Sequence, residues 1–434
     1  SDNYALSFCQ FIDNQSLDNG AKTYFNKSVT GTNDQCSQNY TIRLSAGNVI
    51  NFTVIVNDTT NNINQSEYNG VIGQIVNVLP LNCTKLNKAN TQYDLTQDAS
   101  SAGTCMYVRA NNVTLDCHGF EINYSQSVAG YGVNISSFNS STIRSCSIAQ
   151  ADIASDTIDS YAIYIFNNAT NNTVFNNSIT TVGISGYGML LSSSAYGNSV
   201  YNNSITTTGS NGFGMSLQKT AYGNSVYENS ITTNGPTGYG MYSITAIYSN
   251  SIYGNTITTI DGAGILADTN VYNNSIYGNK ITTGGASGFG VFIQITAYNN
   301  SIYANNITTN GSTAYGVHLS ATAYSNSVYD NTITTNGVSG IGLRLFNNAY
   351  NNYVYSNTIT TWNTNSYGLW LNNNARNNTV YDNNVTTKNM SSSFGIHLRL
   401  NVNNNILYRN KVTALSIGIL INGSGQAATA TTSG

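Results

Sequence analysis

Acidic side chains are the first candidates for chemistry, because carboxylates act as general acids and bases or bind calcium. Glu228, Asp330 and Asp382 share one position of a repeated unit described below. Asp330 and Asp382 lie two repeats apart, roughly 10 Å at the spacing of neighbouring strands, with no acidic residue between them. We therefore expect no catalytic carboxylate pair. Arg409 takes the same position one repeat after Asp382, which predicts an ordinary surface ion pair.

A second acidic group, Asp152, Asp156 and Asp159, falls in a segment that is longer than its neighbours. Ile143 and Val174 occupy equivalent positions but stand 31 residues apart (174 minus 143). The extra residues predict a loop. A calcium site is one interpretation of its three carboxylates, and a solvated loop is the other. The sequence predicts no cofactor and no other metal site.

One column of the repeat combines aromatic and basic side chains: Phe292, His318, Arg344, Trp370 and His397. Exposed aromatic rows on a rigid surface suit stacking against sugars or contact with another protein. We predict a subunit interface at these five residues, with glycan binding and an ordinary surface as the alternatives. No residue of the chain, histidines included, is assigned a catalytic role.

These positions are defined by a repeat of 26 residues. Asn198–Gly223 reads NSVYNNSITTTGSNGFGMSLQKTAYG, and the pattern begins again at Asn224. A period in this range is typical of a solenoid. Short runs of Val, Ile, Thr and Tyr separated by Gly, Asn and Ser favour strands and turns over helices. The repeat is marked by the tyrosines Tyr201, Tyr227, Tyr253, Tyr277, Tyr303, Tyr329, Tyr355, Tyr381 and Tyr408.

Each repeat is expected to hold three short strands. In the unit above they fall around Ser199–Tyr201, Ser204–Thr207 and Phe213–Leu217. Three strands and three bends in 26 residues make one coil of a parallel β-helix. Stacked coils place each column of identical residues in a ladder at the strand spacing, roughly 4.8 Å.

Alternation along these strands predicts which side chains are inside. Val200, Ile205, Met215 and Leu217 should face the core, and a column of mostly alanine residues should line a tight corner. The unbroken asparagine column that includes Asn203 is expected at a bend. Asparagine tolerates the left-handed conformation and can hydrogen-bond to its copies in adjacent coils.

Composition excludes several classes of function. Charged residues make up 8% of the chain and the formal net charge is −3, so nothing favours nucleic acid or an anionic membrane as partner. No apolar run approaches the roughly 18 residues of a membrane span. No signal-peptide pattern stands at the start. We expect a mature, secreted chain at the cell surface.

The cysteines support an extracellular location. All six lie in the first third of the chain without CxxC spacing, which predicts disulfides rather than a metal site. Connectivity cannot be read from the sequence, although Cys117 and Cys146 fall at near-equivalent points of adjacent coils. The six are Cys9, Cys36, Cys83, Cys105, Cys117 and Cys146.

N-glycosylation motifs are dense along the whole chain. An Asn/Ser/Thr-rich repeat also produces such matches by chance, so we expect only part of them to carry covalent N-glycans. The predicted sites are Asn14, Asn26, Asn39, Asn51, Asn57, Asn64, Asn112, Asn123, Asn134, Asn139, Asn168, Asn202, Asn273, Asn299, Asn306, Asn310, Asn377, Asn384, Asn389 and Asn422.

Three regions follow from the extent of the repeat. Residues 1–80 do not follow the period and predict a small N-terminal β domain or cap. Coils occupy residues 81–422, and residues 423–434 form a Gly/Ala/Thr/Ser tail that is flexible or ordered by assembly. A solenoid needs caps because a bare terminal coil exposes core and unpaired strand edges.

The first coils resemble a known family. Tyr93–Asp98 (YDLTQD), Gly103–Cys105 (GTC) and Asn111–Gly119 (NNVTLDCHG) are similar to the opening coils of NosD-like right-handed parallel β-helix proteins. These form the pectate-lyase-like carbohydrate-binding and sugar-hydrolase group of archaeal and bacterial surface proteins. The resemblance covers roughly residues 85–420 and implies a right-handed helix. It does not specify an activity, because the group includes enzymes, binding modules and scaffolds. The paired aspartates and the Arg-x-Lys triplet of polygalacturonase-type members are absent from this sequence.

We therefore predict an all-β, right-handed parallel β-helix with 26 residues and three strands per coil. Its predicted function is that of a glycosylated structural protein without enzymatic activity. It would assemble with its own copies into an extracellular filament or surface layer with an adhesive role. The alternative is a carbohydrate-binding or polysaccharide-cleaving surface protein. Predicted partners are further copies of the chain and surface glycans, with no nucleic acid and no transmembrane segment.

Overall fold

A computed structural model describes the backbone of residues 6–13, 23–28, 52–58, 63–68, 82–151, 160–389, 391–422 and 428–431. Side chains are described for 82–151, 160–389 and 391–422. Every regular element in these ranges is a strand, as the sequence predicts. Contacts between residues divide the chain into two units, 1–80 with 90–94, and 81–89 with 95–434.

The first unit contains a four-stranded antiparallel sheet, in the stretch where the sequence predicts a β domain or cap. Its strand order is β2-β1-β3-β4. β6 (Thr91–Asp94) is grouped with this unit. The other strands are β1 (Leu6–Asp13), β2 (Thr23–Ser28), β3 (Phe52–Asp58) and β4 (Ile63–Tyr68).

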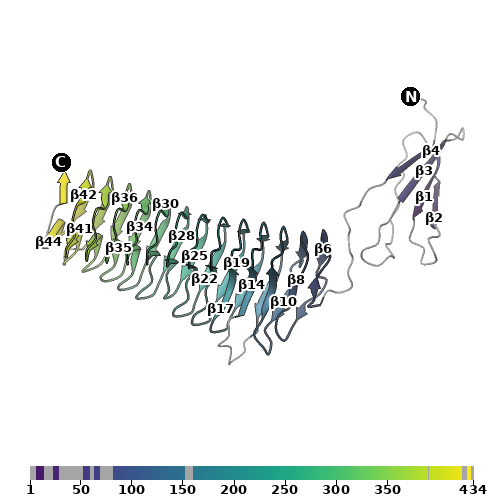
Figure 1. Cartoon of the computed structure of the whole chain (residues 1–434), viewed down its shortest axis with the longest axis horizontal. Coiled ribbons are helices and arrows are strands. Elements are labelled where there is room, and N and C mark those ends of the chain that lie inside the picture. The colour runs from purple at the N-terminus through teal and green to yellow at the C-terminus, as the bar shows by residue number, and fades with distance from the viewer. Residues whose placement is uncertain are drawn as a thin grey trace. The chain divides into compact units, whose positions relative to one another are not determined.

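The second unit is a parallel β-helix of about 13 coils, drawn as the stack of arrows in Figure 1. Each coil contributes one strand to each of three parallel sheets, which we call sheets I, II and III in chain order. Sheet I contains β6, β9 (Val113–Asp116), β12 (Thr142–Arg144), β15 (Thr173–Phe175), β18 (Ser199–Tyr201), β21 (Ser225–Tyr227), β24 (Ser251–Tyr253), β27 (Ser275–Tyr277), β30 (Ser301–Tyr303), β33 (Ser327–Tyr329), β36 (Tyr353–Tyr355), β39 (Thr379–Tyr381), β42 (Asn405–Tyr408) and β45 (Ala428–Thr431).

Sheet II follows one tight turn later in each coil. It contains β7 (Ala99–Ser100), β10 (Glu121–Tyr124), β13 (Ser147–Gln150), β16 (Ser178–Thr181), β19 (Ser204–Thr207), β22 (Ser230–Thr233), β25 (Thr256–Thr259), β28 (Lys280–Thr283), β31 (Asn306–Thr309), β34 (Thr332–Thr335), β37 (Thr358–Thr361), β40 (Asn384–Thr387) and β43 (Lys411–Ala414).

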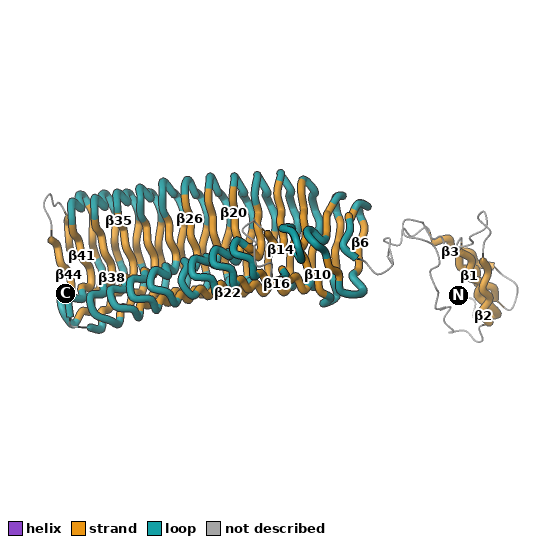
Figure 2. The backbone as a smooth tube through the Cα atoms, turned by 90° about the horizontal axis from the view of Figure 1, so that it is seen from below, coloured by secondary structure: helices purple, strands orange, loops and turns teal. Residues whose placement is uncertain are grey.

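Sheet III closes the coil and runs along one side of it, as the labelled strands β14, β20, β26, β35 and β41 show in Figure 2. It contains β5 (Lys85–Leu86), β8 (Met106–Val108), β11 (Tyr131–Ser136), β14 (Ser160–Phe166), β17 (Gly186–Leu191), β20 (Met215–Gln218), β23 (Met241–Ile244), β26 (Ile265–Asp268), β29 (Val291–Ile293), β32 (Tyr315–Leu319), β35 (Ile341–Phe346), β38 (Tyr367–Asn372), β41 (Phe394–Arg399) and β44 (Ile417–Asn422).

The core is the one that alternation predicts. Val200, Ile205, Met215 and Leu217 are each at most 1% exposed, and Ala221 at the predicted tight corner is fully buried. Neighbouring strands pair in register, so that each residue lies on its counterpart one coil away. The interior is therefore a set of apolar ladders.

Asparagine ladders connect the coils at two bends. The side-chain amide of Asn203 donates to Oδ1 of Asn229 at 2.9 Å, and its backbone N–H donates to the same oxygen at 3.1 Å. Asn198 and Asn224 are joined in the same way in a second ladder. The second ladder was not predicted, although its asparagine recurs as regularly in the sequence. Hydrogen bonding between copies is confirmed.

The expected left-handed conformation falls on a different residue. The ladder asparagines do not have positive φ. The residue before each of them does, for example Asn202 at 52° and Glu228 at 55°. The ladder asparagine is buried and uses its side chain for hydrogen bonds, so the exposed residue at the tip of the turn takes the unusual backbone conformation.

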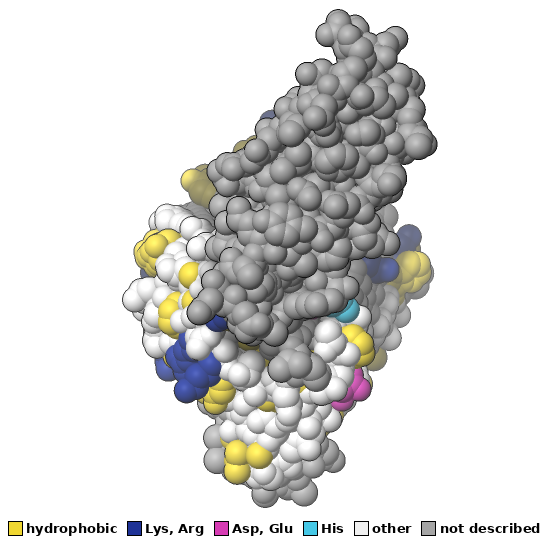
Figure 3. Space-filling view, turned by 90° about the vertical axis from the view of Figure 1, so that its right-hand side faces the viewer, with side chains coloured by type: hydrophobic (Ala, Val, Ile, Leu, Met, Phe, Trp, Pro, Cys, Tyr) yellow, Lys and Arg dark blue, Asp and Glu magenta, His cyan; other side chains and the backbone are white. Residues whose placement is uncertain are grey.

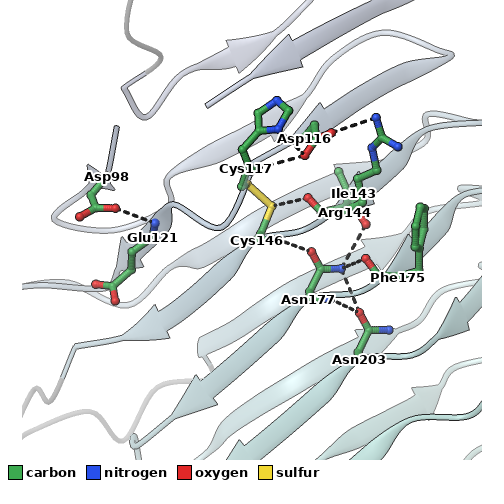
Figure 4. Close-up of a disulfide and its surroundings, with 11 residues drawn as sticks. Asp98, Asp116, Cys117, Glu121, Ile143, Arg144, Cys146, Phe175, Asn177 and Asn203 are labelled. Carbon is green, nitrogen blue, oxygen red and sulfur yellow. Dashed lines mark hydrogen bonds and ion pairs between the residues drawn. A yellow bond between two sulfur atoms is a disulfide. The ribbon is translucent and has the colours of Figure 1, made fainter. Parts of the chain in front are cut away.

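Two disulfides lie within the second unit, Cys83–Cys105 and Cys117–Cys146. The second joins adjacent coils, at the two positions that the sequence places side by side (Figure 4). Next to it Asp116 and Arg144 form an ion pair at 2.9 Å. Cys9 and Cys36 lie outside the described side chains.

Candidate functional site

The column of Glu228, Asp330 and Asp382 lies at the exposed turn tips between sheets I and II. Arg409 donates two hydrogen bonds to the carboxylate of Asp382, at 2.7 and 2.6 Å. This confirms the predicted surface ion pair, which also lowers the pKa of Asp382. The described side chains of this column form no carboxylate pair. Asp152, Asp156 and Asp159 lie outside the described residues, so the calcium interpretation stays a prediction.

Glycine shapes the outer face of sheet III. A Cβ on Gly214 would collide with the side chain of Ile231 in the core, so the glycine and Met215 after it both face inward. The residue before the glycine and the residue two after it then share the outer face. Tyr239 and Tyr242 stand at these two positions one coil later, and their ring centroids are 5.6 Å apart.

Three columns of side chains make up this outer surface, which we call the sheet III face: the residue before each glycine, the residue two after it and the residue four after it, the last including Asp268, Phe346, Asn372 and Arg399. The first holds mostly aromatic rings and was not singled out from the sequence. Its rings stack from coil to coil, for example Tyr187 on Phe213 at 4.6 Å and Phe289 on Tyr315 at 5.0 Å. Because the ring faces are used in this stacking, the edges of the rings and their polar atoms point away from the coils.

The second column contains the five residues of the predicted interface. Phe292, His318, Arg344, Trp370 and His397 lie in register on consecutive strands from β29 to β41. Their alignment in one ladder is confirmed. The exposure expected of all five side chains is not confirmed, because His318 is only 5% exposed and His397 is 3% exposed. These rings are covered by the rings that surround them.

His318 shows how this covering arises. Phe292 stacks on its imidazole at 4.7 Å, and Tyr315 meets it edge-on at 5.0 Å. Both ring nitrogens are buried without a hydrogen-bond partner. Burial, together with the positive charge of Arg344, lowers the pKa of His318 well below its ordinary value. The imidazole is therefore neutral at physiological pH.

His397 repeats this arrangement three coils further on. Its two ring nitrogens are also buried and unpaired, and Tyr367 meets the ring at 5.1 Å. Burial and the charge of Arg399 lower the pKa of His397 to about 4. A neutral imidazole can donate one hydrogen bond and accept another, so each histidine offers both functions to a ligand.

Arg344 lies between these histidines in a cage of rings. Its Nη1 donates a 3.0 Å hydrogen bond to the hydroxyl of Tyr315. The guanidinium carbon is 3.8 Å from the ring centre of Phe346 and 4.4 Å from that of Trp370. Nε of Arg344 and Nε1 of Trp370 are buried without partners. Burial lowers the pKa of Arg344, and no described acidic side chain forms an ion pair with it.

Asp268 is the carboxylate on the described part of the sheet III face, at the end of β26. It hydrogen-bonds to the hydroxyl of Tyr242, and burial together with the negative charge of Asp268 raises the pKa of that tyrosine. Tyr242 therefore stays protonated and acts as the donor. No pattern in the sequence points to this pair, because it is formed by residues of adjacent coils that do not repeat.

The predicted glycosylation sites lie in several environments. Of those with described side chains, Asn134 is 7% exposed. Half-buried are Asn123, Asn139 and Asn389, and exposed are Asn112, Asn168, Asn202, Asn273, Asn299, Asn306, Asn310, Asn377, Asn384 and Asn422. Sites from Asn14 to Asn64 fall outside the described side chains. Occupancy stays a prediction.

No protein-family model matches the chain, and neither does any curated protein. Solved structures do. DFA-IIIase from Arthrobacter chlorophenolicus A6 in complex with DFA-III is 11% identical, over 66% of this chain and 82% of that one, with a TM-score of 0.43. The Azotobacter vinelandii mannuronan C-5 epimerase AlgE6 A-module is 12% identical, over 83% and 89%, with a TM-score of 0.33.

A third such structure is the family 28 exopolygalacturonase of Yersinia enterocolitica. It is 10% identical, over 98% of this chain and 95% of that one, with a TM-score of 0.34. The chain has the right-handed parallel β-helix fold. This is the pectate-lyase-like fold that the resemblance of the first coils implies. At these identities the likeness shows the fold alone.

The comparisons contradict two predictions from the sequence. The first is that the chain is a subunit of a structural filament or surface layer. The second is that it has no enzymatic activity. The structures named above are instead, by their names, a DFA-IIIase, a mannuronan C-5 epimerase and an exopolygalacturonase, and neither prediction is retained. Those predictions rest on the regular repeat, the lack of a catalytic carboxylate cluster, the disulfides and the low charge, and they assign the column from Phe292 to His397 to a subunit interface.

Proposed function

We propose that this chain is a carbohydrate-active protein that binds an extended saccharide chain along the sheet III face. One observation carries the proposal. Four consecutive coils, β32 to β41, hold buried polar atoms without partners on that face, in His318, Arg344, Trp370, Asn372 and His397. Each such group costs about 1–3 kcal/mol when nothing satisfies it, so their concentration on one outer surface calls for a ligand.

Saccharide hydroxyls match this set of groups. The guanidinium and the indole are donors, the amide oxygen of Asn372 is an acceptor, and the neutral imidazoles are both. A sugar hydroxyl also donates and accepts. The column repeats at the strand spacing over four coils, roughly 14 Å from first to last, which suits a ligand that repeats along its own length. The surrounding rings have to shift slightly to admit it.

The chemistry available to such a ligand is limited on this face. Asp268 and Tyr242 form a carboxylate and a protonated hydroxyl in contact, and these are the acid–base candidates. Glycoside hydrolysis by two carboxylates has no support among the described residues of the face. Cleavage or modification of a saccharide by this pair is therefore tested separately from saccharide binding.

Binding is tested with immobilised oligosaccharides, comparing the chain with Trp370→Phe. The substitution keeps an aromatic ring in the stack but removes the indole N–H together with part of the ring, so affinity should fall by at least about 2- to 10-fold, the range of one hydrogen bond. Tyr298→Phe, which removes a hydroxyl from a tyrosine ladder beside sheet I, is the matched control and should leave affinity unchanged. Equal loss in both variants, or binding to no saccharide, would refute the proposal.

The second arm incubates each bound polysaccharide with the chain and measures product length by mass spectrometry. Products that disappear in Asp268→Asn, while binding persists, would assign the chemistry to the Asp268–Tyr242 pair. Intact polysaccharide with retained binding would identify a binding protein.

The location we propose is outside the cytosol. Two disulfides are supported by the structure, and such bonds persist in oxidising compartments. No helix in the described part of the chain is long and apolar enough to cross a membrane. We also propose that the exposed motifs carry N-glycans and that the protein is displayed on the cell surface. Peptide mapping with and without glycosidase treatment tests whether the glycans are present.

A further inference from the structure

We infer that the stacked tyrosines of sheet I form a relay that carries one-electron oxidising equivalents from coil to coil. This inference does not depend on saccharide binding, because it concerns another face of the molecule. The relay, which we call the tyrosine ladder, has one ring in each coil from β18 to β42: Tyr201, Tyr227, Tyr253, Tyr277, Tyr303, Tyr329, Tyr355, Tyr381 and Tyr408.

The first argument is the continuity of the stack. Successive ring centroids are 4.8 or 4.9 Å apart from Tyr201 to Tyr408, and the planes of successive rings differ by only 1–11°. The strand spacing, roughly 4.8 Å, imposes this contact between ring faces. Electron transfer is fastest between groups in contact, because its rate falls steeply with distance. A step to the next coil is therefore favoured over a direct transfer across several coils.

The second argument is the chemistry of the residue that each coil supplies. Tyrosine loses one electron readily when its phenolic proton leaves as well, whereas phenylalanine has no such proton. The aromatic column of the sheet III face includes Phe213 and is interrupted at Ala263, but the tyrosine ladder is not interrupted. Phe175 stacks on Tyr201 at 5.1 Å, so a phenyl ring also fits this column. Packing alone does not require the hydroxyl that every ladder ring carries.

The third argument is that the phenolic protons have acceptors nearby. The ladder tyrosines are half-buried, so each ring packs against its neighbours and still reaches water. Burial, then the adjacent ring and then the carboxylate of Glu228 raise the pKa of Tyr253. Burial, two adjacent rings and then Asp330 raise the pKa of Tyr355. The phenols are therefore protonated at neutral pH, and carboxylates stand beside the ladder to take protons during transfer.

The steps of the relay balance in atoms and electrons. A one-electron oxidant of the peroxyl-radical class takes a hydrogen atom from one tyrosine, which breaks the O–H bond and leaves a hydroperoxide and a tyrosyl radical. The radical then takes one electron from the next ring and a proton from water, while that ring releases its own phenolic proton. A soluble thiol that donates a hydrogen atom to the last radical restores the ladder and becomes a thiyl radical.

The experiment follows the arrival of the oxidising equivalent at one end of the ladder. Replacement of Tyr408 by 3-aminotyrosine places there a ring that is more easily oxidised and whose radical has its own absorbance. Azide radicals from pulse radiolysis, in substoichiometric amount, remove one electron from exposed rings. We expect the aminotyrosyl absorbance to grow in a first-order phase whose rate does not depend on protein concentration, because the oxidising equivalent arrives through the chain.

Tyr381→Phe, combined with that replacement, keeps the ring next to Tyr408 in the stack and removes its hydroxyl. Transfer must then cross two strand spacings, roughly 10 Å, so the first-order rate should fall at least about 10-fold. Tyr350→Phe is the matched control. Tyr350 belongs to a second tyrosine ladder in which Arg376 takes the next position, and its change should leave the rate unaltered. Thermal unfolding checks that both variants fold like the parent chain.

The outcomes decide the inference. A missing concentration-independent phase would overturn the relay, and so would an unaltered rate after Tyr381→Phe. Equal slowing by Tyr381→Phe and Tyr350→Phe would also overturn it, because the loss would then not depend on the ladder. Slowing confined to Tyr381→Phe supports the relay. Tyr303→Phe should in that case lower the amplitude of the phase, because the rings before Tyr303 are cut off from the trap.

Discussion

His397 illustrates how a single residue depends on its neighbours. Its imidazole is 3% exposed, with Tyr367 and Trp370 against it at 5.1 and 5.9 Å. Taking a proton would place a second charge beside Arg399 in a site that water does not reach. The lowered pKa is the consequence, and it keeps the ring able to donate and accept at neutral pH.

The lowered pKa of His397 predicts that the folded chain loses stability in acid. The unfolded chain protonates His397 near its ordinary pKa of 6.5, and the folded chain only near 4. The free energy of unfolding should therefore be fully present above about pH 6.5 and decline as the pH falls toward 4. Urea unfolding measured across this pH range should show a smaller decline in the free energy of unfolding for His397→Gln than for the unchanged chain. Parallel curves would contradict the assignment.

At the scale of the element, the asparagine ladders connect coils that are otherwise held by short strands. Asn229 is 1% exposed. Its side-chain amide donates to Oδ1 of Asn255, to the carbonyl of Val200 and to that of Tyr227, each at 3.0 Å. Because both backbone and side-chain groups of one coil bond to the next, the turns cannot slip in register.

Asn229→Ala should be strongly destabilising. Each buried group left without a partner costs about 1–3 kcal/mol, so the free energy of unfolding should fall by more than about 2 kcal/mol. Asn306→Ala is the matched control, because Asn306 is exposed on β31, and it should change stability by less than about 0.5 kcal/mol. Equal effects in denaturant unfolding would show that the ladder contributes no more than a surface asparagine.

At the scale of the molecule, the second unit is a stack in which each coil pairs with its two neighbours. Stability in such an array is close to a sum of local terms. Charge contributes little, because charged residues make up 8% of the chain. In the coloured part of Figure 3, small basic, acidic and hydrophobic groups lie among uncharged side chains. The Cys117–Cys146 disulfide thus acts on the coils that it joins.

Removing that disulfide should have a local effect. It spans 29 residues, for which chain entropy predicts about 3–4 kcal/mol of stabilisation. In Cys117→Ser with Cys146→Ser, hydrogen exchange of the amides in β9 and β12 should accelerate, while β33 and β36 should exchange as before. Uniform acceleration along the stack would contradict a local role.

Much of the architecture could be predicted from the sequence. Alternation in three short strands placed Val200, Ile205 and Met215 in the core, and the period placed Cys117 beside Cys146. These inferences succeed because a solenoid repeats one local solution, so that residues 26 apart in sequence are neighbours in space. The asparagine ladder followed from the same rule, while the left-handed residue at each turn depended on which side chain was free to be exposed.

The sheet III face marks the limit of that reasoning. The sequence by itself determined the coil, its core and the alignment of Phe292 to His397 in one ladder, because these depend on strand alternation and period. Only the tertiary structure decided that His318 and His397 are covered and neutral, that Arg344 lies in a cage of rings, and that Asp268 meets Tyr242. Those properties arise from non-repeating side chains of adjacent coils, whose burial and charge are set by one another rather than by the period.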